Sequence, residues 1–258
     1  MLLAIDSGNT NVVFAVYDHD QLRASWRAAT NPKRTADEYA VWLTQLMALA
    51  ELARDDIDAT IIANVVPEAA FNLIGLCRRY FNSEPLVVGR PNCTLGIGID
   101  VDMPPQNVGA DRICNAVAAQ DRYQAPLMVV DFGTSTNFDI VDKAGNYCGG
   151  VLAPGPNLAV LALEMAAAQL PRVSIERPPT VVGRSTVPAM QSGVFWGYIG
   201  LVEGLVRRIR EERGEAMGVV ATGGLAPLFA KETAVIDKVD PDLTLWGLHL
   251  IYRRNSNK

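Results

Sequence analysis

An internal repeat limits the folds open to this sequence more than any other feature. Residues 2–18 read LLAIDSGNTNVVFAVYD, and residues 127–142 read LMVVDFGTSTNFDIVD. In both segments an apolar run ends in Asp-x-Gly, and hydroxyl and amide residues precede a second apolar run. Each segment therefore predicts a buried strand, a tight turn and a returning antiparallel strand. With Asp6 and Asp131 at corresponding places, the repeat indicates two similarly built domains.

Apolar runs and helical spacing alternate along the rest of the chain. Further strands are expected at residues 23–28, 59–64, 85–88 and 218–222, and helices at residues 35–53, 68–81, 110–120, 158–170, 191–213, 225–231 and 243–252. Strands that alternate with helices imply a mixed, partly parallel sheet. The stretch 89–108 is rich in Pro and Gly and predicts a loop. Because no low-complexity linker separates the halves, we expect domains over residues 1–118 and 119–258, with a cleft between them.

Composition excludes several classes of function. A net charge of −5 argues against nucleic acid as a partner, and the two histidines make a histidine-based nucleophile or metal centre unexpected. No run reaches the roughly 18 apolar residues of a membrane span, and the first residues lack the basic flank of a signal peptide. The four cysteines lie singly and far apart, which is typical of reduced thiols. We therefore expect a cytoplasmic protein without a membrane or nucleic-acid partner.

Residues 6–11, Asp-Ser-Gly-Asn-Thr-Asn, suit an anion. Gly8 lets backbone N–H groups approach a phosphate, and the amide and hydroxyl side chains add neutral donors. An aspartate tolerates a phosphate only with a cation between them, so Asp6 is expected to face Mg²⁺ or its water shell. The alternative is an ordinary hairpin turn. The second copy, residues 131–137, favours phosphate binding because two equivalent turns could hold a polyphosphate from both sides.

A third glycine turn, Gly223-Gly224, follows the strand expected at residues 218–222 and precedes a short helix. This arrangement suits a flat ligand or a phosphate at the helix N-terminus, although a Gly-Gly turn is also common for structural reasons. The sequence has no G-x-x-x-x-G-K-[ST] loop, and no G-x-G-x-x-G follows either repeated strand. A P-loop nucleotide site is therefore excluded, and the missing dinucleotide motif counts against a dinucleotide oxidoreductase.

These three turns, in this order, resemble the two phosphate motifs and the adenosine motif of the acetate and sugar kinase/Hsc70/actin superfamily. VGADR at residues 108–112, GVLAPGP at 150–156, AMQSG at 189–193 and LTLWGL at 243–248 further resemble type III pantothenate kinase. The resemblance implies two RNase H-like domains, each a mixed β-sheet flanked by helices, with the active site in the interdomain cleft. It also implies ATP-dependent phosphorylation of pantothenate to 4′-phosphopantothenate, the first step of coenzyme A biosynthesis.

The resemblance assigns roles residue by residue. The residues implied to bind ATP phosphates, with Mg²⁺ close to the first of them, are Asp6, Ser7, Gly8, Asn9, Thr10, Asn11, Val12 and Val13. Further implied ATP contacts are Thr134, Gly223 and Gly224, and the implied pantothenate contacts are Gly109, Ala110, Asp111, Arg112 and Thr186. Asp111 would accept the proton, and Asp131 would bind a monovalent cation, K⁺ or NH₄⁺. The resemblance also implies a homodimer in which the neighbouring subunit supplies part of the pantothenate pocket.

The chemistry of the residues agrees with these roles. A carboxylate at Asp111 could take the proton from the weakly nucleophilic hydroxyl of pantothenate, and the fork of Arg112 suits a carboxylate or phosphate. The same pair also occurs as a helix-start carboxylate beside a solvated arginine. Two other functions remain open, a kinase for a sugar or similar metabolite and a regulatory protein. The acidic charge and the intact Asp6, Asp111 and Asp131 argue against the regulatory protein.

Overall fold

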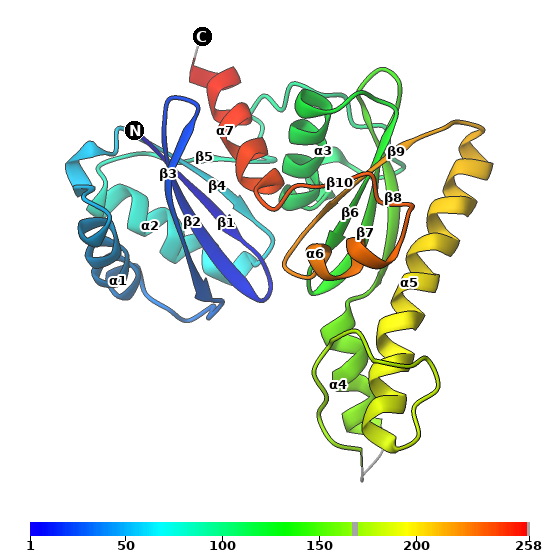
Figure 1. The fold of residues 1–258 in the computed structure, drawn as a ribbon. Helices are drawn as coiled ribbons and strands as arrows, with labels where there is room; N and C mark the ends of the chain where they lie inside the picture. The colour runs from blue at the N-terminus through cyan, green and yellow to red at the C-terminus, as the bar shows by residue number, and fades with distance from the viewer. Residues whose placement is uncertain (167–169, 257–258) are drawn as a thin grey trace. The chain divides into compact units, whose positions relative to one another are not determined.

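The computed structural model describes residues 1–166 and 170–256, which form two compact units (Figure 1). Unit 1 comprises residues 1–122 together with the segment that begins at Asp242, and unit 2 comprises Tyr123–Pro241. The segment from Asp242 onward, which the sequence-based division placed in the second domain, packs in unit 1. No helix in the described ranges is long and apolar enough to cross a membrane.

Unit 1 is built on a five-stranded mixed sheet. Its strands are β1 (Leu2–Ser7), β2 (Asn11–Asp18), β3 (Gln21–Ala29), β4 (Ala59–Asn64) and β5 (Leu86–Val87). The order across the sheet is β3-β2-β1-β4-β5. Neighbours among the first three strands are antiparallel, and β4 runs parallel to both β1 and β5.

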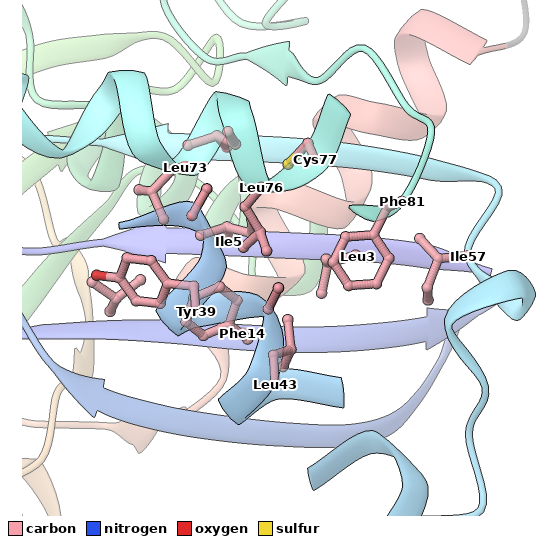
Figure 2. Packing of buried hydrophobic residues seen from close by; sticks show 14 of the residues in the cluster. Leu3, Ile5, Phe14, Tyr39, Leu43, Ile57, Leu73, Leu76, Cys77 and Phe81 are labelled. Atoms are coloured by element: carbon pink, nitrogen blue, oxygen red, sulfur yellow. The ribbon is translucent and has the colours of Figure 1, made fainter. Parts of the chain in front are cut away.

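Helices lie on both faces of the central strands of this sheet, so β1 and β4 are buried on both sides, whereas β3 is mostly exposed. Leu3, Ile5 and Phe14 face α1 (Ala36–Leu49) and α2 (Ala70–Tyr80) in one core (Figure 2). Helix α7 (Leu243–Ser256) contacts β1, β4 and α3 (Ala110–Arg122). Ala4, which alternates along β1 with Leu3 and Ile5, is fully buried although it does not belong to the first core. Short 3₁₀ helices occupy Arg54–Asp56, Pro67–Ala69 and Pro105–Asn107.

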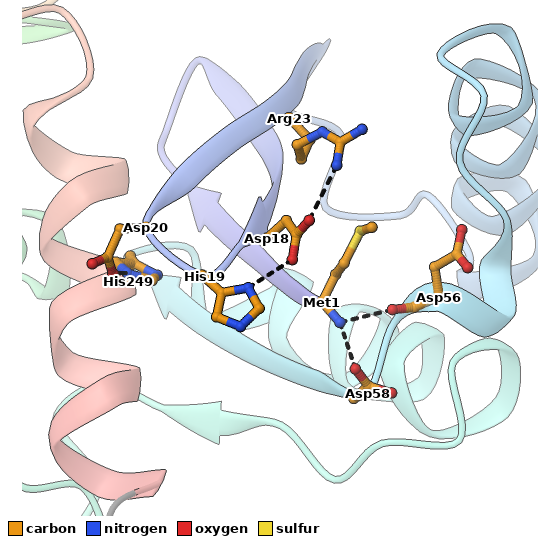
Figure 3. Close-up of polar contacts among 8 residues, drawn as sticks. All are labelled: Met1, Asp18, His19, Asp20, Arg23, Asp56, Asp58 and His249. Carbon is orange, nitrogen blue, oxygen red and sulfur yellow. Dashed lines mark hydrogen bonds and ion pairs between the residues drawn. The ribbon is translucent and has the colours of Figure 1, made fainter.

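Polar contacts fix the ends of unit 1. The N-terminal amine of Met1 bonds to the Asp56 carbonyl oxygen at 2.8 Å and pairs with the Asp58 carboxylate (Figure 3). In the β2–β3 turn, Asp20 accepts from Nε2 of His249 at 2.8 Å and from Arg253 at 2.7 Å. Helix α7 is therefore bonded to the β2–β3 turn as well as packed against the sheet.

Unit 2 repeats the topology of unit 1. Its strands are β6 (Leu127–Phe132), β7 (Ser135–Val141), β8 (Tyr147–Pro154), β9 (Gly218–Thr222) and β10 (Lys238–Val239). The order is β10-β9-β6-β7-β8, with β6 antiparallel to β7 and parallel to β9. Strands β6, β7, β8, β9 and β10 thus take the places of β1, β2, β3, β4 and β5. The predicted duplication is confirmed.

The helices of unit 2 are α4 (Pro156–Ala166), α5 (Thr186–Arg213) and α6 (Ala226–Phe229), followed by a 3₁₀ turn at Ala230–Glu232. Phe132, Phe195 and Phe229 stack in its core, with ring centroids 5.1 and 5.5 Å apart. Helix α4 and the N-terminal part of α5 project away from the sheet (Figure 1). Helix α5 begins before the predicted residue 191, and residues 167–169 of the predicted helix 158–170 lie outside the described residues.

Candidate active site

The first repeated turn, which we call turn A (residues 6–11), connects β1 to β2. The Gly8 N–H donates to the Asn11 carbonyl oxygen at 3.0 Å, and this bond closes the turn. Asn9 and Thr10 are exposed, and Asp6 is half-buried. Turn A therefore presents a carboxylate and polar side chains at the carboxyl end of a buried strand, as the sequence predicts for an anion site.

Three of the predicted ATP-binding residues, Ser7, Val12 and Val13, have side chains that are buried or half-buried. Ser7 and Val12 are fully buried, and among the described residues the Ser7 hydroxyl has no hydrogen-bond partner. Their side chains lie in the core of unit 1, so any contact with a ligand would come from their backbone atoms. Val13 is half-buried and pairs with Asp6 across the β1–β2 ladder.

The predicted base lies in the first turn of α3. Gly109 accepts the N–H of Ile113 at 3.1 Å, Ala110 is the first helical residue, and Oδ1 of Asp111 accepts the backbone N–H of Arg112 at 2.8 Å. Burial raises the pKa of Asp111, and the N–H and charge of Arg112 only partly oppose this effect. A carboxylate with a raised pKa binds a proton more readily, which suits a general base.

Asp6 of turn A and Asp111 of α3 influence the same buried group. Cys114, a fully buried residue of α3, has a pKa raised well above its usual value, first by burial and then by the negative charges of Asp6 and Asp111. Two carboxylates that are far apart in the sequence therefore lie near enough to one thiol of unit 1 to affect its charge.

Turn B (residues 131–135) is the corresponding turn of unit 2. Asp131 pairs with Asn137 of β7 and with Thr222 of β9, so its carboxylate lies among oxygen-bearing side chains. Ser135 donates its hydroxyl to Oδ1 of Asn137 at 2.9 Å, and the Gly133 N–H donates to the Ser135 carbonyl oxygen at 3.0 Å. Thr134 is exposed, as an ATP contact requires.

The late glycine pair packs directly against turn B. Gly223 has φ +90°, and a Cβ built there would lie 2.7 Å from Oδ1 of Asp131 and 2.6 Å from the Phe132 carbonyl oxygen. A side chain at this position would therefore displace the turn, whereas Gly224 is exposed. The structure brings two of the predicted site segments of unit 2 together.

Thr186 is the predicted site residue that stands apart. It is exposed and begins α5, whose N-terminal end lies away from the sheet of unit 2 (Figure 1). Turn B and Gly223 lie instead at the carboxyl ends of β6 and β9. Within unit 2 the structure does not gather Thr186 with the other predicted site residues.

Two contacts of the turns escaped sequence reasoning. The Thr30 hydroxyl donates to the Gly8 carbonyl oxygen at 2.6 Å, and the Gly155 N–H donates to the Thr134 carbonyl oxygen at 3.0 Å. Both residues follow the third strand of a sheet. Their contacts depend on strand register. Comparing the two repeats as far as the third strand of each unit would have aligned Thr30 with Gly155 and so pointed to both residues.

The sequence model that describes type III pantothenate kinases matches residues 2–208 of this chain. The chain belongs to the type III pantothenate kinase family. Its curated relatives include the type III pantothenate kinases of Rhodospirillum rubrum and Paramagnetospirillum magneticum, both 64% identical. The first alignment covers 99% of both chains, and the second covers 99% of this chain and 98% of the relative. As a type III pantothenate kinase the chain is an enzyme, and membership in a kinase family implies the use of ATP.

Solved structures agree on the fold of this type III pantothenate kinase. A protein assigned to the Baf family of transcriptional activators from Campylobacter jejuni superposes with a TM-score of 0.61 at 20% identity, covering 99% of this chain and 100% of that one. A protein described as an N-acetylmannosamine kinase from Listeria monocytogenes gives 0.57 at 10% identity, covering 99% of both chains. The predicted pair of RNase H-like domains, of the acetate and sugar kinase/Hsc70/actin type, is confirmed.

Proposed function

We propose that this enzyme transfers the terminal phosphoryl group of ATP to the primary hydroxyl of pantothenate, which yields 4′-phosphopantothenate for coenzyme A biosynthesis. The observation that carries the proposal is the family match, with relatives 64% identical over 99% of the chain. The VGADR segment supports it, since its aspartate lies in the first turn of α3 with a raised pKa.

In the proposed reaction Asp111 takes the proton of the hydroxyl as the oxygen attacks phosphorus. General base assistance of this kind is typically worth about 10²–10⁴-fold in rate. Arg112 is half-buried beside it and carries a charge that is present at every physiological pH. We assign to Arg112 the pantothenate carboxylate or the transferring phosphate, either of which its fork can hold.

Turn A supplies the groups proposed for the ATP phosphates. Phosphoryl transfer depends mainly on alignment and on neutralising charge, and the exposed Asn9 and Thr10 offer donors that carry no charge. The half-buried carboxylate of Asp6 is a hard oxygen ligand of the kind that Mg²⁺ prefers, directly or through water. Magnesium bound there would supply the positive charge that lets a carboxylate and a phosphate lie side by side.

The oxygen-rich surroundings of Asp131 fit the proposed site for K⁺ or NH₄⁺. Its carboxylate, the Ser135 hydroxyl and the Asn137 amide oxygen come from adjacent positions of β6 and β7. A monovalent cation would supply one positive charge near Thr134 and so complement the charge of ATP. We assign Thr134, Gly223 and Gly224 to ATP.

We also propose that the enzyme is a cytoplasmic homodimer in which unit 2 forms the interface. Exposed apolar side chains gather on the projecting helices α4 and α5, namely Leu158, Leu161, Met165 and Val187. A Cβ at Gly193, Gly197 or Gly200 of α5 would meet open space, so this helix face can receive another helix closely. Thr186 at the start of α5 is then assigned to the pantothenate pocket of the neighbouring subunit.

A turnover assay tests the proposal. Purified protein is incubated with pantothenate, ATP and Mg²⁺ in K⁺, NH₄⁺ or Na⁺ buffers, and phosphopantothenate is measured by mass spectrometry. We expect product in every buffer and faster turnover with K⁺ or NH₄⁺ than with Na⁺. The Asp131→Asn variant, which keeps the size of the side chain but loses its charge, is expected to lose the difference between the cations. No turnover in any buffer, or equal turnover on a panel of sugars, would refute the assignment of pantothenate.

A further inference from the structure

The residue after the third strand holds the same place in both units. In unit 1 the β2–β3 ladder ends with Asn11 opposite Ala29, and in unit 2 the β7–β8 ladder ends with Ser135 opposite Pro154. The next residue donates its backbone N–H to the turn, from Thr30 to the Thr10 carbonyl oxygen at 2.9 Å and from Gly155 to that of Thr134 at 3.0 Å. Thr30 and Gly155 are therefore equivalent under the duplication.

Thr30 makes a second bond to the same turn. Its hydroxyl donates to the Gly8 carbonyl oxygen at 2.6 Å, so one residue holds two carbonyl groups of turn A. In a trans peptide the C=O and N–H groups point in opposite directions. Fixing the Gly8 carbonyl oxygen therefore directs the Asn9 N–H away from Thr30, and Asn9 lies on the exposed part of the turn.

Gly155 performs the equivalent task without a side chain. A Cβ at this position would lie 2.2 Å from the Thr134 carbonyl oxygen and 2.6 Å from that of Gly133. Helix α4 begins at the next residue, Pro156, and the Gly155 carbonyl oxygen accepts the N–H of Ala159 at 3.0 Å. In unit 2 the turn is thus held by close backbone contact, and in unit 1 by a hydroxyl.

We propose that Thr30 is a positioning residue for ATP, which holds the Gly8–Asn9 peptide of turn A in the orientation that binds phosphate. The proposal rests on the assignment of turn A to the ATP phosphates. Thr30 acts through the turn rather than on the reacting atoms, since its hydroxyl proton is engaged by the Gly8 carbonyl oxygen. Its removal should therefore weaken nucleotide binding and leave the affinity for pantothenate unchanged.

The test compares Thr30→Val, which keeps the shape but loses the hydroxyl, with Thr30→Ser, which keeps the hydroxyl. Thr44→Val is the matched control, because the Thr44 hydroxyl donates to a backbone carbonyl oxygen of α1, that of Ala40, at 2.7 Å. Binding of a non-hydrolysable ATP analogue with Mg²⁺ is measured by calorimetry, and KM is measured for each substrate. We expect binding about 3- to 10-fold weaker for Thr30→Val, as for one lost hydrogen bond, with near-normal binding for Thr30→Ser and Thr44→Val.

The outcome separates this proposal from the assignment of pantothenate. Nucleotide binding does not depend on the acceptor, so wild-type protein that binds the analogue without phosphorylating pantothenate would refute only the acceptor. Unchanged analogue binding by Thr30→Val, or equal loss in Thr30→Ser, would overturn the role of Thr30. Equal increases in both KM values would do so as well, because a general loss of structure affects both substrates. Thr30→Ala, with the same expected loss, replaces Thr30→Val if the latter does not fold.

Discussion

Asp111 holds a carboxylate where burial disfavours its charged form. Its pKa is raised, so the folded chain binds the proton more tightly than the unfolded chain does. The contribution of this group to the free energy of unfolding therefore falls as pH rises from 3.8, the ordinary carboxyl value, through the raised pKa. If Asp111 is the base, as proposed, its ionised form serves catalysis at the expense of stability.

Replacing Asp111 with Asn tests the effect of this carboxylate on both turnover and the free energy of unfolding. We expect turnover to fall about 10²–10⁴-fold while nucleotide binding persists, and the free energy of unfolding at pH 7 to be equal to or above that of wild type. Steady-state kinetics, analogue titration and urea unfolding measure the three quantities. In wild type, kcat/KM should fall on acidification with a midpoint above the pKa of an ordinary carboxyl group, because the pKa of Asp111 is raised. Near-normal turnover of the variant would show that Asp111 is not the base.

His249 gives a second pH dependence with a different origin. It is 3% exposed, and Nε2 bonds to Asp20, while Nδ1 has no hydrogen-bond partner in the part of the chain that the structure describes, as in a neutral ring. Burial lowers the pKa of His249 below 6.5, and the hydrogen bond that its ring donates to Asp20 opposes this only in part. The folded chain thus binds the proton less tightly than the unfolded chain does. The stability that the neutral ring provides is present above pH 6.5 and is lost as pH falls through the lowered pKa.

The His249→Gln variant, whose amide can still donate to Asp20, is expected not to lose stability in this way as pH falls. Urea unfolding at a series of pH values between 7 and about 5 should show a slope in wild type that the variant lacks. One proton limits the slope to about 1.4 kcal/mol per pH unit. His19→Gln is the control, because the His19 side chain is 96% exposed. The same slope in wild type and His249→Gln would assign the acid sensitivity to other groups.

At the scale of elements, α7 determines where α3 lies. Gly247 of α7 meets α3 so closely that a Cβ would lie 2.0 Å from the Cys114 carbonyl oxygen. Beside this contact the Thr244 hydroxyl donates to Oδ1 of Asn115 at 2.7 Å. Since Asp111 lies one helical turn before Cys114 and Asn115, the helix from the far end of the sequence supports the segment that carries the proposed base.

We expect Gly247→Ala to destabilise unit 1 by at least about 1–3 kcal/mol, because the added methyl group forces two helix backbones apart. Urea unfolding measures the change. Ser256→Ala, at the exposed end of the same helix, is expected to stay within about 0.5 kcal/mol of wild type. A Gly247→Ala variant as stable as wild type would mean that the two helices can separate without cost.

The elements were predictable from sequence to the extent that their patterns are local. Apolar spacing located most strands and helices, and the Asp-x-Gly turns located turns A and B. Strand β8 was missed because Gly149 and Gly150 interrupt its pattern, and β10 because it has only two residues, Lys238 and Val239. The shared effect of Asp6 and Asp111 on the Cys114 pKa and the two hydrogen bonds from Thr30 to turn A depend on strand register and helix packing, which spacing along the chain does not encode.

At the scale of the whole molecule, the proposed dimer can be tested by a substitution on the glycine face of α5, which carries Gly193, Gly197 and Gly200. Gly197→Leu should leave the fold intact, because a Cβ at Gly197 meets no atom of the described residues within 4 Å, but it should block a second helix. We expect sedimentation velocity to show a dimer for wild type and a monomer for the variant, with unchanged circular dichroism. Glu212→Leu, exposed near the end of the same helix, is the control and should remain dimeric. A dimeric Gly197→Leu protein would place the interface elsewhere.

The return of α7 to unit 1 has a consequence for how the protein is made. The contact of α7 with β1 and α3 cannot form until the ribosome has synthesised all of Tyr123–Pro241. At about 5–20 residues per second, this interval lasts on the order of ten seconds, during which one face of β1 lacks its final helix. A contact that spans most of the sequence also forms slowly. The first unit to be translated is thus the last to be completed, and the segment with the proposed base gains its support only then.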